Sequence, residues 1–362
     1  MRDYKSIIKE RGFFIIAELG VNYYDIAEKN NISIIDAARL MIDKAKENGA
    51  DAVKFQAYKA EKLAIKDSPA YWELKEEPTT SQFELFHKYD KFDEDDYKDL
   101  SIYSSKKNII FMSTPFDFEA TDFLFDLMPI YKISSSDLNN TPFIEYIASK
   151  GKPIFLSTGA ATLREIDEAI SVITSTGNNE ICLLHCILDY PTENKNINLN
   201  MIKYLRRIYP KYLIGYSDHA KPDKNMLITT LAYVYGAKII EKHFTLDKNI
   251  VGNDHYHAMD PSDLKKLITN LKLVREISGQ FKKEPLECEM ISRKMARRSI
   301  VANNKIDKGD IINRDNLVFK RPGTGIPPSM LDRVVGGVAL RDIHEDEIIT
   351  FDSIKLKNSH KG

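Results

Sequence analysis

The chain has 362 residues, of which 43% are hydrophobic and 29% charged, and its formal net charge is −1 at pH 7. This balance provides no electrostatic field for a nucleic acid, and no apolar run has the length of a membrane span or a secretory signal, so we expect neither nucleic-acid nor membrane association. The cysteines, Cys182, Cys186 and Cys288, form no CxxC pair, so we expect reduced thiols in the core of a cytoplasmic protein.

Eight short apolar runs alternate with helix-like segments between residues 13 and 277. The runs span residues 13–18, 50–56, 109–115, 130–137, 153–159, 181–186, 212–219 and 237–243. Helix patterns include residues 33–48, 94–107 and 261–277. This order predicts an α/β protein with a closed (β/α)8 TIM barrel, because an open doubly wound sheet rarely needs eight such units.

Two loops of the predicted barrel are unusual. Residues 19–31 form a polar and aromatic loop after the first run. Residues 57–92, after the second run, are longer and contain the only tryptophan, Trp72. Loops of this length usually carry function, so we expect residues 57–92 to belong to the site.

The chain is expected to divide into a barrel of residues 1–280, a charged, aperiodic linker of residues 281–296, and a small β-rich domain of residues 297–362. Residues 306–317 and 343–354 repeat Ile, Ile-Ile and Asp in register, which predicts two related β-turn units paired about a pseudo-twofold axis. Between them, a loop rich in Gly and Pro presents Arg321.

Polar residues follow the predicted strands at their carboxyl ends, where barrel enzymes build their active sites. The expected set that converges on one mouth is Glu18, Lys54, Gln56, Thr114, Lys132, Ser135, Ser157, His185, Ser217, His219, Glu241 and His243.

Two members of this set, His219 and His243, end the seventh and eighth runs. Each lies within two residues of a carboxylate, Asp218 or Glu241. Imidazoles at neighbouring strand ends, with carboxylates to orient the rings, predict a divalent-metal site. The alternative is a pair of histidines that only make structural hydrogen bonds.

The two lysines and the hydroxyls of the mouth suit a phosphate group. Lys54 and Lys132 would supply the positive charge, and the strand-end hydroxyls would donate to the phosphate oxygens. The alternative is that both lysines pair with carboxylates of the mouth. The two arrangements are compatible, one in the free and one in the bound state.

Ten short motifs occur along the chain in a fixed order. They are IIAELGVN, GADAVKFQ, FMSTPFD, YKISSSDLNN, IFLSTGA, LLHC with YPT, IGYSDH, IIEKHFTLD, RRSIVA and KRPGTG. With these motifs, essentially the whole chain resembles the sialic acid synthase family, and its C-terminal part resembles the antifreeze-like (SAF, β-clip) domain fused to those enzymes. The family members are transferases that condense phosphoenolpyruvate with N-acetylmannosamine or a related N-acylated amino sugar to make a nonulosonic acid.

The resemblance also implies roles for particular residues. It implies that His219 and His243 bind a divalent metal, most often Mn²⁺ with Mg²⁺ or Co²⁺ as alternatives, which polarises the sugar aldehyde. Glu18 matches the catalytic acid near the reacting carbons. The matches to phosphoenolpyruvate-binding positions are Lys54, Gln56, Thr114, Lys132, Ser135, Ser157 and Ser217, and the matches to sugar-lining positions are Phe116, Asp137, Tyr190 and Asp254.

Arg321 and the assembly are a further implication of the resemblance. It implies a domain-swapped homodimer, in which Arg321 of one subunit reaches the acyl group of the sugar in its partner. The predicted linker is long enough to reach a neighbouring subunit, since an extended chain spans up to ~3.5 Å per residue.

The sequence departs from the common family pattern at three positions. Tyr23 stands where many members have histidine, Leu188 stands where several have a polar residue near the sugar, and Asp137 stands where Glu is frequent, although Asp also occurs. N-acetylmannosamine remains the first expectation for the acceptor, and a legionaminate- or pseudaminate-type synthase that uses a 6-deoxy diacetamido sugar is the alternative. More distant alternatives are a 3-deoxy-2-keto acid phosphate synthase and a non-catalytic sugar-binding protein.

Overall fold

The computed structural model describes residues 3–357, so residues 1–2 of the expected barrel and 358–362 of the expected second domain lie outside the described residues. The chain forms two compact units, Met1–Gly279 and Gln280–Gly362, and each is considered by itself.

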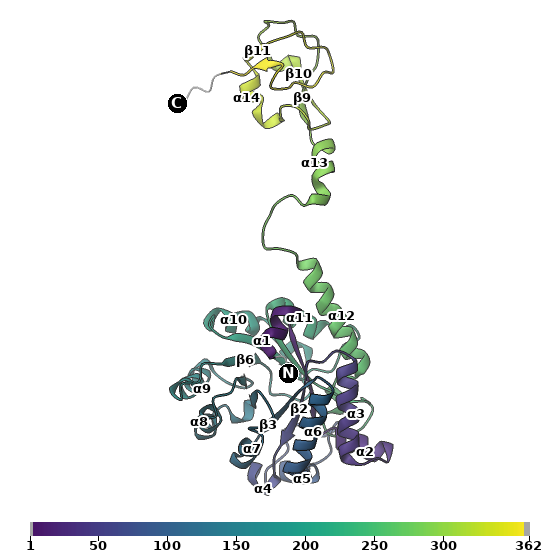
Figure 1. Ribbon diagram of the computed structural model, residues 1–362, viewed down its shortest axis with the longest axis vertical. Coiled ribbons are helices and arrows are strands. Elements are labelled where there is room, and N and C mark those ends of the chain that lie inside the picture. The colour runs from purple at the N-terminus through teal and green to yellow at the C-terminus, as the bar shows by residue number, and fades with distance from the viewer. Residues whose placement is uncertain (1–2, 358–362) are drawn as a thin grey trace. The chain divides into compact units, whose positions relative to one another are not determined.

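The first unit is built on eight parallel strands. They are β1 (Phe14–Gly20), β2 (Ala52–Ala57), β3 (Ile110–Pro115), β4 (Tyr131–Ile133), β5 (Ile154–Ser157), β6 (Ile181–His185), β7 (Leu213–Asp218) and β8 (Ile239–His243). Their order is β3-β2-β1-β8-β7-β6-β5-β4, and the two end strands β3 and β4 lie next to each other. The predicted TIM barrel is confirmed, with the helices arranged around the strands (Figure 1).

The helices of this unit follow the strands in alternation. They are α1 (Tyr4–Arg11), α2 (Tyr23–Asn30), α3 (Ile34–Glu47), α4 (Ala60–Leu63), α5 (Gln82–Lys88), α6 (Glu94–Lys106), α7 (Phe118–Phe123), α8 (Thr141–Ser149), α9 (Leu163–Ser175), α10 (Asn200–Ile208), α11 (Leu227–Tyr235) and α12 (Pro261–Ser278). Several begin at side chains that accept from the first free backbone N–H groups: Ser33 caps α3, and Asp93, Thr162 and Asp260 form capping boxes.

Three segments differ from the sequence expectation. Residues 23–30, expected as a loop, form α2, because Tyr24, Ile26 and Ala27 bury one side of the helix against the barrel. The stretch of residues 57–92 contains α4 and α5. The fourth strand is shorter than predicted, because the Ser134 side chain accepts from the Ser136 N–H and starts a 3-10 helix at Ser135.

The inside of the barrel changes from apolar to polar along the strands. Alternate residues of a strand face the same side, so β1 points Phe14, Ile16 and Glu18 inward in succession. The first two belong to an apolar cluster with the inward residues of the other strands, and Tyr4 of α1 packs against this cluster at the amino end. The polar site is therefore formed by the inward residues near the carboxyl ends of the strands.

The outer face of the strands carries a buried ion pair. Lys242 of β8 lies 2.6 Å from Asp218 of β7, its ammonium also donates to the Ala220 carbonyl at 2.7 Å, and the two side chains are 1% and 2% exposed. The Asp218 carboxylate accepts from the Tyr216 hydroxyl as well. Asp218 therefore joins two strands. The expectation that it orients the ring of His219 is wrong.

The second unit has its own apolar core around two small antiparallel sheets. β9 (Ser299–Ala302) pairs with β10 (Leu317–Lys320), and β11 (Val338–Ala339) pairs with β12 (Ile354–Lys355). Ile306 and Ile343 exchange both backbone hydrogen bonds at 2.9 Å, so the two repeated segments pair as predicted. The unit also contains α14 (Leu331–Val334). α13 (Met290–Ala296) lies within the segment that was expected to be an aperiodic linker.

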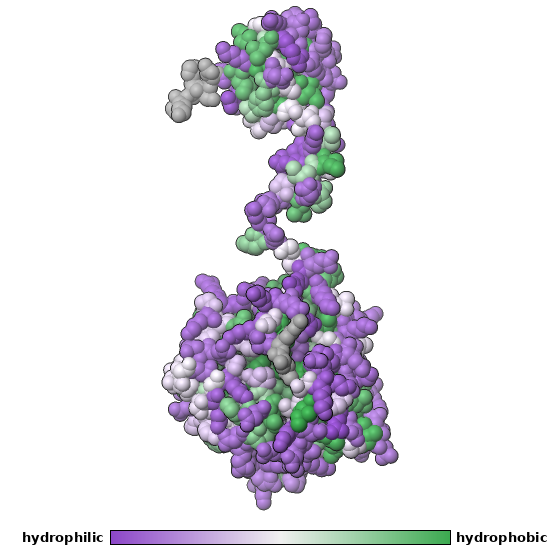
Figure 2. Space-filling view, in the orientation of Figure 1, coloured by the Kyte–Doolittle hydropathy of each residue, from purple (hydrophilic) through white to green (hydrophobic). Residues whose placement is uncertain are grey.

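The expectations drawn from composition concern the surface, membrane association and the cysteines, and the structure agrees with them only in part. Figure 2 shows a mostly hydrophilic surface on the visible face of the barrel. Within residues 3–357, no helix combines the length and the apolar character that a membrane crossing requires. All three cysteines are free, but Cys288 is exposed, so the expectation of a core thiol is wrong for this residue.

We predict that Lys242→Ala lowers the free energy of unfolding of the barrel by about 3–5 kcal/mol, because it leaves the buried Asp218 carboxylate without its counter-ion. Lys5→Ala is the matched control, since it removes the exposed Lys5–Glu180 pair and is expected to cost at most about 1 kcal/mol. Urea unfolding followed by circular dichroism measures both. Equal losses in the two variants would contradict the prediction.

Candidate active site

The register of the strands sets the geometry of the site. Glu18 of β1 lies beside Lys54 on one neighbouring strand and beside His243 on the other. Ser217 of β7 lies beside Glu241 of β8 in the same way. The parallel ladder thus brings a carboxylate, an ammonium group and an imidazole together at one height of the barrel, although they are far apart in the sequence.

Two cavities open at this level. The smaller has a volume of about 60 Å³, and the residues that line it are Glu18, Lys54, Gln56, Thr114, Phe116, Lys132, Ser134, Ser135, Ser157, Cys186, Tyr190, Ser217, His219, Glu241 and His243. The larger has a volume of about 420 Å³. The two cavities adjoin, because five residues line both of them: Gln56, Phe116, Ser134, Tyr190 and His243.

Two lysines and two glutamates form a buried charge cluster in the smaller cavity. The Lys54 ammonium lies 2.6 Å from the Glu18 carboxylate and 3.9 Å from that of Glu241, while the Lys132 ammonium lies 3.6 Å from Glu241. Lys54 also donates to the Thr114 hydroxyl at 2.9 Å. The ion pairs expected as the alternative use of the lysines are therefore present, and both ammonium groups still face the cavity.

The cluster changes the protonation of its members. Burial raises the pKa of Glu18 to about 7, with a further rise from the nearby Glu241 carboxylate, although Lys54 acts in the opposite direction. Burial opposes ionisation of Glu241 too, but Lys132, Lys54 and the hydrogen bond from Ser217 lower its pKa overall. Burial lowers the pKa of Lys132. Glu18 is thus the carboxyl of the cluster that can exchange a proton near neutrality.

Hydroxyl groups surround this cluster. Ser217 donates to Glu241 at 2.9 Å, and Ser135 accepts from the Gly159 backbone N–H at 2.9 Å. The Ser157 hydroxyl is buried and has no hydrogen-bond partner among the described residues, so it is available to a ligand.

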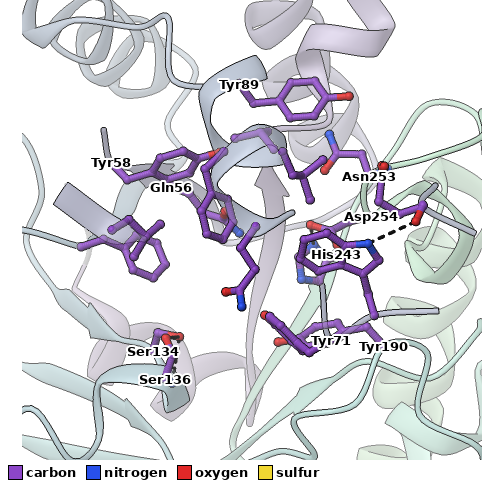
Figure 3. A pocket seen from close by; sticks show the side chains of 18 of the residues that line it. Gln56, Tyr58, Tyr71, Tyr89, Ser134, Ser136, Tyr190, His243, Asn253 and Asp254 are labelled. Atoms are coloured by element: carbon purple, nitrogen blue, oxygen red, sulfur yellow. Dashed lines mark hydrogen bonds and ion pairs between the residues drawn. The ribbon is translucent and has the colours of Figure 1, made fainter. Parts of the chain in front are cut away.

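The larger cavity is lined by aromatic, apolar and acidic side chains. Tyr58, Tyr71, Trp72 and Tyr89 come from residues 57–92, which supports the expectation that this long stretch belongs to the site. Figure 3 shows Tyr71, Tyr190, His243 and Asp254 around one part of the cavity and Ser134 and Ser136 around another. Leu188 belongs to the lining as well, and so do the acidic residues Glu77, Asp137 and Asp254.

Two of these acids have altered protonation. Burial raises the pKa of Asp137 to about 6, and burial together with the Glu77 carboxylate raises that of Asp254 to about 7. Both carboxyls can therefore donate or accept hydrogen bonds around neutral pH.

The two predicted metal ligands lie close together. The ring centres of His219 and His243 are 5.8 Å apart, and the ring nitrogen Nδ1 of His219 lies 2.7 Å from the Ile187 carbonyl, which leaves Nε2 for a ligand. Burial lowers the pKa of His219 to about 4 and that of His243 well below its usual range, so both are neutral at pH 7. Neutral imidazoles are the form that binds a divalent cation.

The donor set also includes residues that the sequence analysis did not assign to a metal. Ligand atoms of His243, Asp254 and His257 all lie within 4.8 Å of one another, and the Asp254 carboxylate lies 3.3 Å from Nδ1 of His243. Nδ1 of His243 and both ring nitrogens of His257 are buried without a hydrogen bond to any described residue. Imidazole nitrogens with one carboxylate fit Mn²⁺, Co²⁺ or Zn²⁺.

Every barrel residue expected to have a catalytic, substrate-binding or metal-binding role lines one of the two cavities, and these roles stay predictions. His185 is an exception within the wider set of strand-end polar groups. It faces the outside of β6, where Nε2 lies 3.0 Å from the Ile197 carbonyl and the ring stacks on Tyr216. The expectation that it joins the mouth is wrong, because the alternation of the strand points it away.

Arg321 belongs to the second unit. Its side chain is exposed, and within residues 3–357 it has no hydrogen-bond or ion-pair partner.

The NeuB family model matches residues 41–283, and the SAF domain model matches residues 297–355. N,N'-diacetyllegionaminic acid synthase of Campylobacter jejuni is 37% identical over 92% of this chain and 98% of its own, and human N-acetylneuraminate-9-phosphate synthase is 32% identical over 93% and 91%. A solved N-acetylneuraminic acid synthetase of Leptospira borgpetersenii, in complex with citrate, has a TM-score of 0.66, 35% identity and coverage of 77% and 90%.

We predict that the pKa of Glu18 lies near 7, well above that of a free glutamate side chain. Because the pKa is raised, the carboxyl is protonated below this pH and ionised above it. Carbonyl-carbon NMR of protein labelled at the glutamate side-chain carboxyls should show one resonance with this midpoint, and Glu18→Gln should remove it.

Glu165→Gln is the matched control, since hydrogen bonds from Thr162 lower the pKa of this exposed carboxyl. The control should leave the resonance near pH 7 in place. A wild-type spectrum in which every glutamate titrates in the ordinary acidic range would contradict the assignment.

Proposed function

Since this chain belongs to the NeuB family of nonulosonic acid synthases, we propose that it condenses phosphoenolpyruvate with an unphosphorylated N-acylated amino sugar and releases phosphate. The observation that carries the proposal is the pair of adjoining cavities, one small and lined with ammonium and hydroxyl groups, the other larger and lined with aromatic and acidic groups. A carboxyl and two neutral imidazoles lie at their junction.

Phosphoenolpyruvate is proposed to occupy the smaller cavity. Lys54 and Lys132 attract its phosphate and carboxylate, and the Ser157 hydroxyl has no competing partner among the described residues. Entry of this anion allows the lysines to exchange part of their pairing with Glu18 and Glu241 for pairing with the substrate. The free-energy cost of removing water from the lysines is already part of folding, so little reorganisation accompanies substrate binding.

A divalent cation held by His219 and His243, most suitably Mn²⁺, would polarise the aldehyde oxygen of the sugar. His243 is suited to this position because it lines both cavities. The cation therefore fits where the reacting carbons of the two substrates would meet.

The reaction forms one carbon–carbon bond and breaks one carbon–oxygen bond. C3 of phosphoenolpyruvate attacks the aldehyde carbon, the aldehyde oxygen takes a proton to become a hydroxyl, and C2 gains cationic character. Water adds to C2 and loses a proton. The tetrahedral intermediate then expels phosphate with the electrons of the C2–O bond, and the C2 hydroxyl loses its proton to become the keto group of the product. Overall, one proton of the added water goes to the new hydroxyl and the other to phosphate.

Glu18 is proposed to take the proton from that water. Its carboxylate lies in the smaller cavity, where Lys54 at 2.6 Å and the Gln56 amide at 3.2 Å orient it. A pKa of about 7 gives a base that is largely ionised at slightly alkaline pH and still basic enough to accept a proton. A non-catalytic sugar-binding protein would have no use for this buried charge cluster.

The larger cavity favours a sugar without phosphate. Glu77, Asp137 and Asp254 line it, and no lysine or arginine occurs among the described residues of its lining. Like charges that meet inside such a site cost several kcal/mol. This argues against a 3-deoxy-2-keto acid phosphate synthase, which needs a second phosphate site, and distinguishes the chain from the human 9-phosphate synthase.

The lining also bears on the choice between the two expected acceptors. Sequence alone puts N-acetylmannosamine first. Leu188 and the aromatic wall formed by Tyr58, Tyr71 and Trp72 instead suit a methyl group and a second acetamido group, so we propose the 6-deoxy diacetamido sugar of a legionaminate-type synthase. The similarity to the Campylobacter jejuni enzyme supports this second candidate.

We predict that, with phosphoenolpyruvate and Mn²⁺, kcat/KM is about 10- to 100-fold higher for the 6-deoxy diacetamido sugar than for N-acetylmannosamine. N-acetylmannosamine 6-phosphate should fall about 100-fold or more below its unphosphorylated form. Acceptor-dependent phosphate release measures all three, with a reaction lacking acceptor as the control.

The outcomes separate the claims. Preference for N-acetylmannosamine would overturn the argument from the apolar wall, efficient use of the 6-phosphate would overturn the argument from the acidic lining, and no acceptor-dependent release would reject the synthase function.

We further propose a domain-swapped homodimer of a cytoplasmic protein. The exposed Arg321 guanidinium, without a partner among residues 3–357, is available to donate to the acyl carbonyl of a sugar bound by a second copy. The cytoplasmic location rests on the three free thiols.

We predict that mixing Arg321→Ala chains with Glu18→Gln chains restores activity that neither variant has alone. In a swapped heterodimer one composite site contains both wild-type residues, so full exchange should regenerate about a quarter of the wild-type sites. Phosphate release after subunit exchange, confirmed by native mass spectrometry, measures the rescue.

Two Glu18→Gln preparations mixed with each other provide the control, and they should stay inactive. A monomer in sedimentation, or confirmed exchange without rescue, would show that each site is built from one chain.

A further inference from the structure

His257 is a buried residue that the proposed reaction does not use. Its side chain is 0% exposed, and neither ring nitrogen makes a hydrogen bond with a described residue. An imidazole buried in this way loses its hydrogen bonds to water without replacement, which costs free energy. A group with that cost needs a partner to explain it.

The neighbouring His255 shows what a satisfied histidine looks like in the same turn. It is equally buried, but Nδ1 lies 2.7 Å from the Thr245 hydroxyl and Nε2 lies 3.2 Å from the Asp25 carboxylate. Both ring nitrogens of His255 therefore have a hydrogen-bond partner, whereas neither ring nitrogen of His257, two residues further along the chain, has one among the described residues.

The backbone holds His257 beside the end of β8. After the excursion that follows β8, the Met259 N–H donates to the His243 carbonyl at 2.7 Å, and the Thr245 N–H donates to the Met259 carbonyl at 3.0 Å. These two hydrogen bonds return the segment alongside the strand. The position of His257 is thus set by the barrel, and the ring cannot easily turn away to find water.

The ring of His257 completes a triangle with the two expected metal ligands. Its centre lies 4.7 Å from that of His243 and 6.2 Å from that of His219, and the latter two are 5.8 Å apart. Ligand atoms of His243, Asp254 and His257 lie within 4.8 Å of one another. Two nitrogens on one cation are at most about 4.2 Å apart at a metal–nitrogen distance near 2.1 Å, so shared binding by His243 and His257 requires only a small contraction. His219 lies outside this group, and its ring must move closer to share the cation.

The other possible role for His257 is to position its neighbours. Its Nε2 lies 3.7 Å from the Asp254 carboxylate, beyond hydrogen-bond distance, and its ring packs against Tyr190 and Tyr256. A positioning role would use at most one nitrogen and would leave the other without a partner. Direct contact with a cation accounts better for an imidazole held next to two others.

We propose that His257 is a third imidazole ligand of the divalent cation, together with His219 and His243. The proposal rests on the proposed function only in that both need a cation at this position. A third imidazole makes the cation more strongly held by the protein and leaves fewer coordination positions for substrate and water, so it favours retention of metal through purification.

The test counts nitrogen ligands directly. The full-length protein, stripped with a chelator, is loaded with Cu²⁺, and pulsed EPR counts the coordinated imidazoles. We expect three in the wild type and two in His257→Gln, a variant that keeps polar bulk at the position. Mn²⁺ titration, followed by the EPR signal of the free ion, should give a Kd raised by at least about 10-fold in the same variant.

His255→Gln is the matched control from the same turn and should keep three imidazoles. A count of two in the wild type, unchanged in His257→Gln, would overturn the proposal, even with weakened Mn²⁺ binding, since that pattern is expected of a positioning residue. Loss of one imidazole in both variants would also overturn it, because it would reflect disruption of the turn.

Neither readout uses synthase activity, so the two proposals fail separately. A protein that loses one imidazole only in His257→Gln, yet condenses no acceptor, would keep the ligand assignment and reject the function. Condensation with an unchanged imidazole count would do the reverse.

Discussion

The buried pair of Lys54 and Glu18 is the contact on which the rest of the site depends. Each of these charges loses several kcal/mol of hydration inside the barrel, and their attraction at 2.6 Å offsets this only with help from neighbouring groups. Lys132 and Glu241 provide a second pair that balances the total charge of the cluster. An anionic substrate then enters a site whose positive groups are already desolvated and oriented.

The barrel can tolerate such a cluster because the layers beneath it are apolar. Phe14 and Ile16 precede Glu18 on the inner face of β1, and the equivalent residues of other strands close the amino end with Tyr4. The opposite face of the same strands carries its own buried pair, Lys242 and Asp218. Polar groups are thus confined to one level inside the barrel and to a structural pair outside it.

Under the proposed function, selectivity would come from segments outside the strands of the barrel. Residues 57–92 supply the aromatic wall of the larger cavity, and the segment between β8 and α12 supplies Asp254 and the unpartnered His257. In the proposed reaction, the strands would set where the bond-forming chemistry takes place, while these loops would set which sugar fits and how the cation is held. This division is the usual one in barrel enzymes, whose loops vary on a constant frame.

The sequence by itself determined the strands and the inner face of each, because side chains alternate with a period of two and the strand-end residues follow from it. It therefore predicted Glu18, Lys54 and His243 at one mouth. The same alternation points His185 outward, which the prediction of His185 at the mouth overlooked. Only the tertiary structure decided that Asp218 pairs with Lys242, since the register between strands is not written in either strand alone. His257 lies in a segment without periodicity, and its place depends on backbone hydrogen bonds to β8.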